Sequence, residues 1–386
     1  MARSERIVLS RIDRRILAED IRAPMALPST DNSAVDGYGF RHADFGLATG
    51  CGLQLVGISA AGRPLARTVG QGEAVRILTG GVPPSGVDTI AMQEDVERVG
   101  DCIRMKGGIS LHANIRRQGE DIAAGSIVFS AGRVLGPVDL ALLASLGFAE
   151  VPVHGRLRVA LLSTGDELVE AGGIRRPGSI YDANRPALCA LLRRTGCDVT
   201  DLGIVADNRD RLGSTLKSAA AGHDAILTSA GVSAGDEDHV RSAVQSLGGL
   251  DFQGVAIKPG RPIAVGHVAG VPFFGLPGNP AATLISFLFI VRPALQRLAG
   301  AAVSPPRRHP VQADFAMTKR AGRREFIRCR LVAGENWLSA RRTERDGAGI
   351  LSSLSDADGL LEFDEATTEI LPGDILPFIP FSELGL

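Results

Sequence analysis

Hydrophobic and polar residues follow four successive patterns along the chain, and each pattern predicts a different kind of structure. Residues 1–22 are charged and amphipathic, which predicts a short helix. Residues 24–133 hold short apolar runs, such as 74–78, between glycine-rich turns, and this is typical of an all-β region. Residues 136–146 then form a helical pattern that Gly147 ends as a C-cap.

The third pattern, over residues 156–299, alternates between strand and helix. We predict strands at 158–162, 199–205, 225–229, 252–257, 263–267 and 272–275, and helices at 184–195, from Asp207 as N-cap, at 238–247 and from Asn279-Pro280. Right-handed crossovers join strands that alternate with helices of this length. The pattern therefore predicts a three-layer α/β domain with a mainly parallel sheet.

The fourth pattern begins after Ser304-Pro305-Pro306, where short strands return at 326–331 and 337–341. Such strands predict a small β-barrel or sandwich at the end of the chain. The fold class expected for the whole chain is thus a multidomain protein of α/β and β units.

Composition narrows the classes of function. The 386 residues carry a formal net charge of -1 and no basic tail or stripe, which argues against duplex nucleic acid as a partner. The longest apolar run, 281–291, is too short to span a bilayer, and the N-terminus lacks the apolar centre of a signal peptide. Five scattered cysteines without a CxxC pair indicate neither a disulfide framework nor a zinc site. We expect a cytoplasmic protein that binds no membrane.

Residues with chemical potential follow the predicted strands of the α/β region. In an open parallel sheet, ligands bind beyond the carboxyl ends of the strands. The residues placed there are Ser163, Thr164, Gly165, Glu167, Asp207, Gly231, Ser233, Asp238, Pro277, Gly278, Asn279 and Pro280. Glycine amides and a helix N-terminus suit a phosphate, whereas the carboxylates imply a bridging Mg²⁺. Each element alone could be an ordinary capped turn, but their convergence on one rim favours a ligand site.

The turn Lys258-Pro259-Gly260-Arg261-Pro262 adds two cations. A pyrophosphate and an oxyanion a few Å apart repel each other by several kcal/mol at an effective dielectric constant of about 20. A site that holds both anions therefore needs Lys, Arg and a metal together. The alternative is a surface turn with solvated charges.

Several segments together resemble the MoeA/gephyrin E-domain family of molybdopterin molybdenumtransferases. They occur in the family's order over nearly the whole chain and comprise LPSTDNSAVDGYGF, RILTGGVPPSGVDTIAMQED, RRQGEDI, STGDEL, SIYDANRPAL, SAGVSAGDEDHV, AIKPGRPIAVG, GLPGNP and GRREFIRCRL. An ordered series of motifs is far more specific than any one of them. The implied function is the insertion of molybdate into adenylated molybdopterin, with Mg²⁺-dependent release of AMP.

The resemblance also implies four domains and an elongated homodimer. The domains would be a linking domain (1–22 plus 134–155), an inserted β-rich domain (23–133), an α/β molybdopterin-binding domain (156–302) and a C-terminal β-barrel (303–386). Asp36, Thr79 and Asp121 of one subunit would face the α/β cleft of the other. Further expected partners are the adenylyltransferase of the same pathway and apo-molybdoenzymes.

Residue roles follow from matching positions. Glu167, Asp207 and Asp238 match essential carboxylates near metal and pterin phosphate, and Lys258 and Arg261 match a molybdate-associated turn in which Arg261 replaces a lysine. Pro277, Gly278, Asn279 and Pro280 match the phosphate-side turn. Ala282 replaces a frequent serine, although Thr283 is adjacent, and Thr30, Val35 and Ala230 stand where Phe, Met and Gly are common.

Two other functions remain open at this point. A molybdopterin adenylyltransferase shares the α/β domain, but its loop usually has Gly-Gly-Thr-Gly where this chain has residues 230–233, and it lacks flanking β domains. A gephyrin-like scaffold would need a long linker and a second α/β domain, and neither is evident here. Which enzyme receives the cofactor, and whether tungstate competes, does not follow from the residues.

Overall fold

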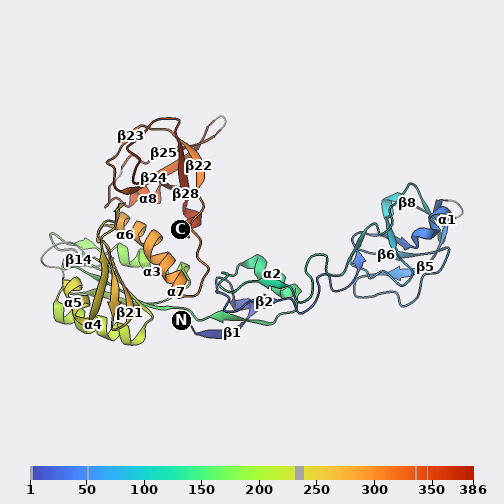
Figure 1. Ribbon diagram of the computed structural model, residues 1–386, viewed down its shortest axis with the longest axis horizontal. Helices are drawn as coiled ribbons and strands as arrows, with labels where there is room; N and C mark the ends of the chain where they lie inside the picture. Colours follow the sequence, from blue (N-terminus) through green and yellow to red (C-terminus); the bar gives the residue numbers. More distant parts are fainter. Residues whose placement is uncertain (1–2, 50–51, 231–238, 335–336, 346) are drawn as a thin grey trace.

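The computed structural model describes residues 3–49, 52–230, 239–334, 337–345 and 347–386. The molecule is elongated (Figure 1). An α/β lobe and a small barrel stand side by side at one end, a β-rich lobe forms the other end, and a slender linking unit joins them.

The linking unit is built from both ends of the first 155 residues. Strand β1 (Ser4–Val8) pairs antiparallel with β12 (Glu150–His154), β2 (Ile21–Arg22) pairs with β11 (Ile127–Phe129), and helix α2 (Pro137–Ser145) packs beside them. The predicted helix at residues 1–22 is wrong. The isolated segment is too short to be a stable helix, and its backbone instead bonds β12 over five residues.

The β-rich lobe holds a six-stranded sheet in the order β7-β4-β6-β5-β9-β8. Its strands are β4 (Gly37–Phe40), β5 (Leu53–Ser59), β6 (Glu73–Ile77), β7 (Thr89–Met92), β8 (Val96–Val99) and β9 (Cys102–Met105). The short helix α1 (Phe45–Thr49) follows β4. Phe40, Leu53 and Ile103 are buried in its core. A separate pair, β3 (Asn32–Ser33) and β10 (Ile115–Arg116), leads into the lobe.

The α/β lobe contains a six-stranded sheet in the order β16-β13-β17-β21-β20-β18. Four strands are parallel: β16 (Asp198–Val205), β13 (Arg158–Thr164), β17 (Ala225–Ser229) and β21 (Val271–Leu276). Strand β20 (Ala264–Val268) is antiparallel to both of its neighbours, β21 and the edge strand β18 (Gly248–Gln253). The predicted strand at 252–257 was misplaced: Gly248 follows the preceding helix directly, and the antiparallel register with β20 begins there.

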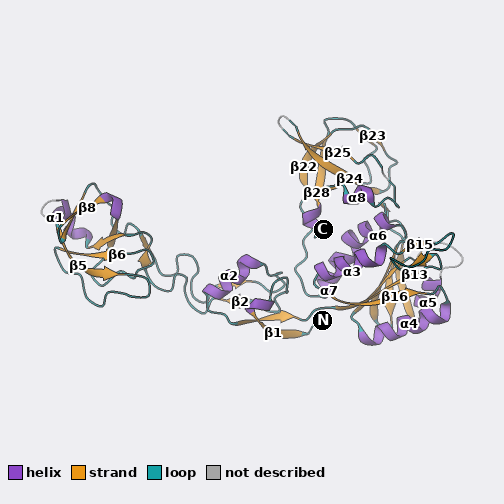
Figure 2. Cartoon of the chain, turned by 180° about the vertical axis from the view of Figure 1, so that it is seen from behind, coloured by secondary structure: helices purple, strands orange, loops and turns teal. Residues whose placement is uncertain are grey.

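Helices cover both faces of this sheet, as predicted (Figure 2). One layer holds α3 (Asn184–Arg194) and α6 (Pro280–Ser286), and the other holds α4 (Arg209–Gly222) and α5 (His239–Leu247). A short parallel pair, β14 (Leu168–Val169) and β15 (Ile180–Tyr181), extends from the end of β13.

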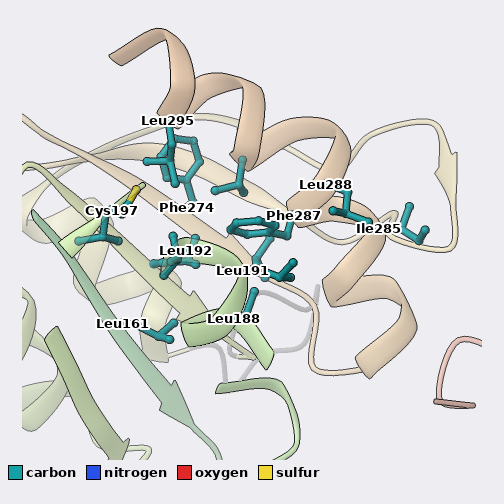
Figure 3. Close-up of a cluster of buried hydrophobic side chains, with 14 of the residues drawn as sticks. Leu161, Leu188, Leu191, Leu192, Cys197, Phe274, Ile285, Phe287, Leu288 and Leu295 are labelled. Carbon is teal, nitrogen blue, oxygen red and sulfur yellow. The ribbon is translucent and has the colours of Figure 1, made fainter. Parts of the chain in front are cut away.

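Helix α6 continues through a π-helical turn (Phe287–Val291) into α7 (Arg292–Leu298). The helix runs on through Arg292-Pro293, and the π-helical turn just before Pro293 changes the backbone hydrogen-bond pattern there. The 19 residues from Pro280 to Leu298 are apolar and long enough to cross a membrane by length and composition, but half of them are buried. Phe287, Leu288 and Leu295 pack on the sheet (Figure 3), so this is a core helix.

The C-terminal domain is a closed five-stranded barrel. Its ring runs β24-β25-β22-β28-β26 and closes because β26 pairs with β24. The strands are β22 (His309–Ala313), β24 (Arg324–Ala333), β25 (Leu338–Arg342), β26 (Gly359–Phe363) and β28 (Ile375–Pro380); β23 (Met317–Thr318) pairs with β27 (Glu369–Ile370), and α8 (Ser352–Ser355) is a single turn. The prediction of a β-barrel is confirmed.

The barrel contacts the α/β lobe at several places, among them strand β19 (Ile257–Lys258) and a pair of aromatic rings. Strand β19 belongs to the α/β lobe by sequence but pairs in parallel with β24 of the barrel. The rings of Phe289 and Phe326 stack with centroids 4.0 Å apart. These contacts fix the turn that follows β19 against the barrel.

Candidate active site

Two buried hydroxyl-bearing residues end the central strand β13. Ser163 and Thr164 are almost completely inaccessible, and neither hydroxyl has a hydrogen-bond partner among the described residues. Side chains alternate along a strand, so Ser163 faces the layer of α3 and α6 and Thr164 faces the layer of α4 and α5. An unpaired buried hydroxyl costs about 1–3 kcal/mol, so both groups are suited to bond a ligand at this rim.

The turn after β13 places a carboxylate close to the backbone. Gly165 has φ +144°, and the amide of Leu168 donates to its carbonyl over 3.0 Å. A Cβ atom at position 165 would lie 2.5 Å from Oε2 of Glu167. The Glu167 side chain therefore folds back over Gly165, which only glycine permits.

Asp207 lies at the end of the neighbouring strand β16 but does not cap helix α4, contrary to our prediction. Asn208 is the N-cap, and its side chain accepts from the amides of Asp210 and Arg211 at 3.0 and 3.1 Å. The amide of Asp207 is 3.5 Å from Oδ1 of Asp166. Asp166, Glu167 and Asp207 thus bring three carboxylates to one part of the rim.

The predicted metal site is only partly described. Gly231, Ser233 and Asp238 lie outside the described residues, and no group of three His, Cys, Asp or Glu side chains among the described residues is arranged to hold a metal ion. The predicted metal ligands that are described, Glu167 and Asp207, are carboxylates, as is the neighbouring Asp166. Oxygen donors of this kind fit a hard cation such as Mg²⁺.

Asn184 connects two parts of the rim and was missed as a site residue. Its Nδ2 atom donates to Oγ of Ser229 over 2.8 Å and to the carbonyl of Gly278 over 2.7 Å. It therefore ties the end of β17 to the turn before α6. The segment SIYDANRPAL contains it, but the sequence pattern indicated only the start of a helix.

Arg185 is the second residue that was missed. Its buried guanidinium bonds Asp182 over 3.0 Å, Asp201 over 2.5 Å and the carboxylate of Glu170. Burial lowers the pKa of Arg185, but the three carboxylates more than offset burial and the net pKa is raised. The network joins α3 and β16 to Glu170 and Asp182, which directly follow β14 and β15. Glu167 directly precedes β14.

The turn before α6 offers fewer donors than we predicted. Pro280 begins the helix and lacks an amide hydrogen, and the amide of Ala281 already donates to the carbonyl of Ala348, over 3.0 Å. Gly278 and Asn279 are exposed. The Thr283 hydroxyl cannot replace a serine at position 282, because it is buried and donates to the carbonyl of Pro277 over 2.5 Å.

The cationic turn, residues 258–262, packs against helix α6. Gly260 has φ +118°, and a Cβ atom there would lie 2.6 Å from Oγ of Ser286 in α6. Arg261 is exposed, whereas Lys258 donates from Nζ to Oε2 of Glu325 over 3.1 Å. Helix α6 thus carries the phosphate-side turn at its start and the cationic turn against its side.

Three predicted residues lie in the distant β-rich lobe. Asp36 accepts from the amide and hydroxyl of Thr79, each over 2.7 Å, and these bonds lower the pKa of the Asp36 carboxyl. Asp121 lies in the segment between β10 and β11, and its amide donates to the carbonyl of Leu27. One chain does not bring this lobe to the rim that carries Glu167 (Figure 1).

Three family models match most of the chain. Residues 1–147 match the MoeA N-terminal region (domain I and II), residues 160–297 match a probable molybdopterin binding domain, and residues 310–381 match the MoeA C-terminal region (domain IV). The chain belongs to the MoeA family. Its sequence is 36% identical over 385 residues to the molybdopterin molybdenumtransferase of Haemophilus influenzae, covering 99% of this chain and 95% of that one.

Other MoeA relatives agree in sequence and fold. Molybdopterin molybdenumtransferase 2 of Mycobacterium tuberculosis is 36% identical, with 93% of this chain and 90% of the relative covered. The crystal structure of a molybdopterin biosynthesis MoeA protein from Pyrococcus horikoshii OT3 superposes with a TM-score of 0.85 at 28% identity, covering 98% of this chain and 95% of that chain. A second structure of MoeA from Pyrococcus gives 0.78 at 30% identity with the same coverage.

Proposed function

We propose that this chain is a molybdopterin molybdenumtransferase, which transfers molybdenum from molybdate to adenylated molybdopterin in the last step of molybdenum cofactor synthesis. The identity of 36% over 99% of the chain to a relative of that name carries the proposal. The β-rich lobe and the barrel flank the α/β lobe, and they argue against a molybdopterin adenylyltransferase, which lacks them.

The chemistry of the rim supports this reaction. Ser163 and Thr164 offer hydroxyls to the phosphate groups of adenylated molybdopterin, together with the exposed turn at Gly278 and Asn279. Lys258 and Arg261 attract the molybdate oxyanion. Glu167, Asp207 and, by its place in the sequence, Asp238 would hold Mg²⁺, and a cation there would supply positive charge next to the phosphates.

Catalysis on such a rim depends on positioning and charge neutralisation. Molybdate is held beside the dithiolene sulfurs, which bind molybdenum as one molybdate oxygen leaves as water with the two thiol protons. A water molecule cleaves the phosphoanhydride bond, which gives AMP and the phosphate of the molybdenum-loaded pterin. Gly165 and Arg185 contribute indirectly, because they fix the position of the turn that carries Glu167.

The proposed active form is a homodimer in the cytoplasm. Asp36, Thr79 and Asp121 reach the rim only if the β-rich lobe of a second subunit supplies them, since one chain holds them at its far end (Figure 1). Further partners in this proposal are the adenylyltransferase that makes the substrate and the apo-molybdoenzymes that receive the product.

Reconstitution of an apo-molybdoenzyme tests the proposal. The purified chain, with adenylated molybdopterin, molybdate and Mg²⁺, is expected to restore enzyme activity. Glu167→Gln and Asp207→Asn are expected to lower the rate at least about 100-fold, because each removes a carboxylate ligand of the cation that would neutralise the reacting phosphates. Wild-type rates in both variants would defeat the site assignment.

A further inference from the structure

The ion pair between Lys258 and Glu325 is unusual in its asymmetry. The Glu325 side chain is 5% exposed, whereas the Lys258 side chain is 58% exposed. Only one contact, from Nζ to Oε2 over 3.1 Å, joins them. A lysine ammonium has three N–H donors, so the pair leaves Lys258 with donors on its open side.

The backbone fixes the place of this pair. Lys258 and Glu325 are direct partners in the parallel register of β19 and β24, and the amide of Arg324 donates to the carbonyl of Ala256 over 2.8 Å. The neighbouring cation Arg324 bonds Glu362 and Glu365 instead. Glu325 therefore acts on the charge of Lys258 and, through it, on the cationic turn.

Glu325 has two opposite effects on an oxyanion at this turn. Its hydrogen bond restrains the ammonium, which favours binding, but its negative charge repels the anion. The repulsion is Coulombic and acts twice as strongly on a dianion as on a monoanion. With Glu325 counted, Lys258 and Arg261 leave the turn one net positive charge instead of two.

We propose that Glu325, a buried residue of the barrel, balances the charge of Lys258 and thereby limits the affinity of the cationic turn for tetrahedral dianions. The inference rests on the proposed function, in which molybdate docks at this turn. Tight binding of the free oxyanion would not speed its transfer, because stabilisation shared by ground state and transition state leaves the chemical step unchanged. Weak docking also limits occupation of the turn by sulfate.

Glu325→Gln separates the two effects. Glutamine has nearly the same shape and still accepts a hydrogen bond from Lys258, so only the negative charge is lost. Titration of the full-length protein with molybdate alone is expected to give a Kd about tenfold lower than in wild type, with sulfate shifted in the same direction. The KM for molybdate in AMP release is expected to fall while that for adenylated molybdopterin stays unchanged.

Glu362→Gln is the matched control. Glu362 is similarly buried on the adjacent strand β26 but pairs with Arg308 and Arg324, so its loss is expected to leave the molybdate Kd within about twofold of wild type. Damage to the fold weakens binding, whereas the expected result is tighter binding. If Glu325→Gln does not fold, Glu325→Met removes the same charge, and we expect it to lower the Kd as well.

The outcomes distinguish this inference from the proposed function. The double variant Lys258→Met/Glu325→Gln removes the cation without leaving a buried carboxylate unpaired. If it binds molybdate as wild type does, the oxyanion does not dock at Lys258 and both proposals fail. If the double variant weakens binding but Glu325→Gln leaves the Kd unchanged or higher, the role of Glu325 alone is refuted.

Discussion

Single residues of the rim combine buried polar groups with tightly constrained backbone. Ser163 and Thr164 have unpaired buried hydroxyls among the described residues, and Gly165 lies beneath the Glu167 carboxylate. The identities of these residues could be predicted from the sequence, because strand ends and glycine turns are visible there. Their burial and the folded-back Glu167 could not, because both depend on packing between distant elements.

Gly165→Ala tests the position of Glu167. The added methyl would clash with Oε2 of Glu167, and alanine at φ +144° is strained by about 1–2 kcal/mol, so we expect AMP release to fall at least about tenfold. Gly172→Ala is the control: Gly172 also has a positive φ but nothing within 4 Å of an added Cβ. Activity is measured at a temperature where both variants remain folded, and equal activity in the two would contradict this role of Gly165.

At the scale of elements, patterns that depend on local sequence were predicted well. The parallel strands, the helices between them and the proline at the start of α6 follow from apolar spacing and caps. Strand β1 was predicted as a helix because its partner β12 lies more than 140 residues away. Similarly, neither β19 nor Glu325 was predicted, since strand pairing between two domains leaves no periodic pattern.

The Arg185 network makes the stability of the α/β lobe depend on pH. Burial alone would raise the pKa of Asp201, but hydrogen bonds from Arg185 and from the amide of Gly203 lower it overall. The unfolded chain then binds a proton more readily than the folded one, so ionised Asp201 stabilises the fold above its unfolded pKa of about 3.9. This contribution is lost as the pH falls through the lowered pKa.

Urea unfolding of wild type and Asp201→Asn measures this effect. At pH 7 we expect the variant to be less stable, and the difference between the two proteins to shrink as the pH falls from about 5. A difference that stays constant down to acid unfolding would show that Asp201 acts through packing rather than through its charge.

The whole molecule separates residues that the proposed reaction needs together. Asp36 and Thr79 bond each other in the β-rich lobe. Glu167 and Lys258 belong to the α/β lobe, which lies at the opposite end of the molecule (Figure 1). Only the family resemblance assigned Asp36, Thr79 and Asp121 to a shared cleft. In the proposed homodimer this cleft forms between two subunits, so no contact within one chain would reveal it.

Subunit mixing tests the shared cleft. Asp36→Asn and Glu167→Gln proteins are each expected to be nearly inactive, but unfolded and refolded together they should recover about a quarter of wild-type activity, since half the dimers are mixed and each holds one intact cleft. Refolding each variant alone is the control. If a mixture exchanges subunits yet stays inactive, Asp36 and Glu167 do not act together across two subunits, and the shared cleft is refuted.

The central claim is that the rim of the α/β lobe couples molybdenum transfer to AMP release. Its most direct test is a single-turnover reaction of the purified chain with adenylated molybdopterin and Mg²⁺, in which AMP and molybdenum-loaded pterin are measured together. We predict equal amounts of both products with molybdate and neither product without it. Full AMP release in the absence of molybdate, or AMP release without molybdenum in the pterin, would contradict the account.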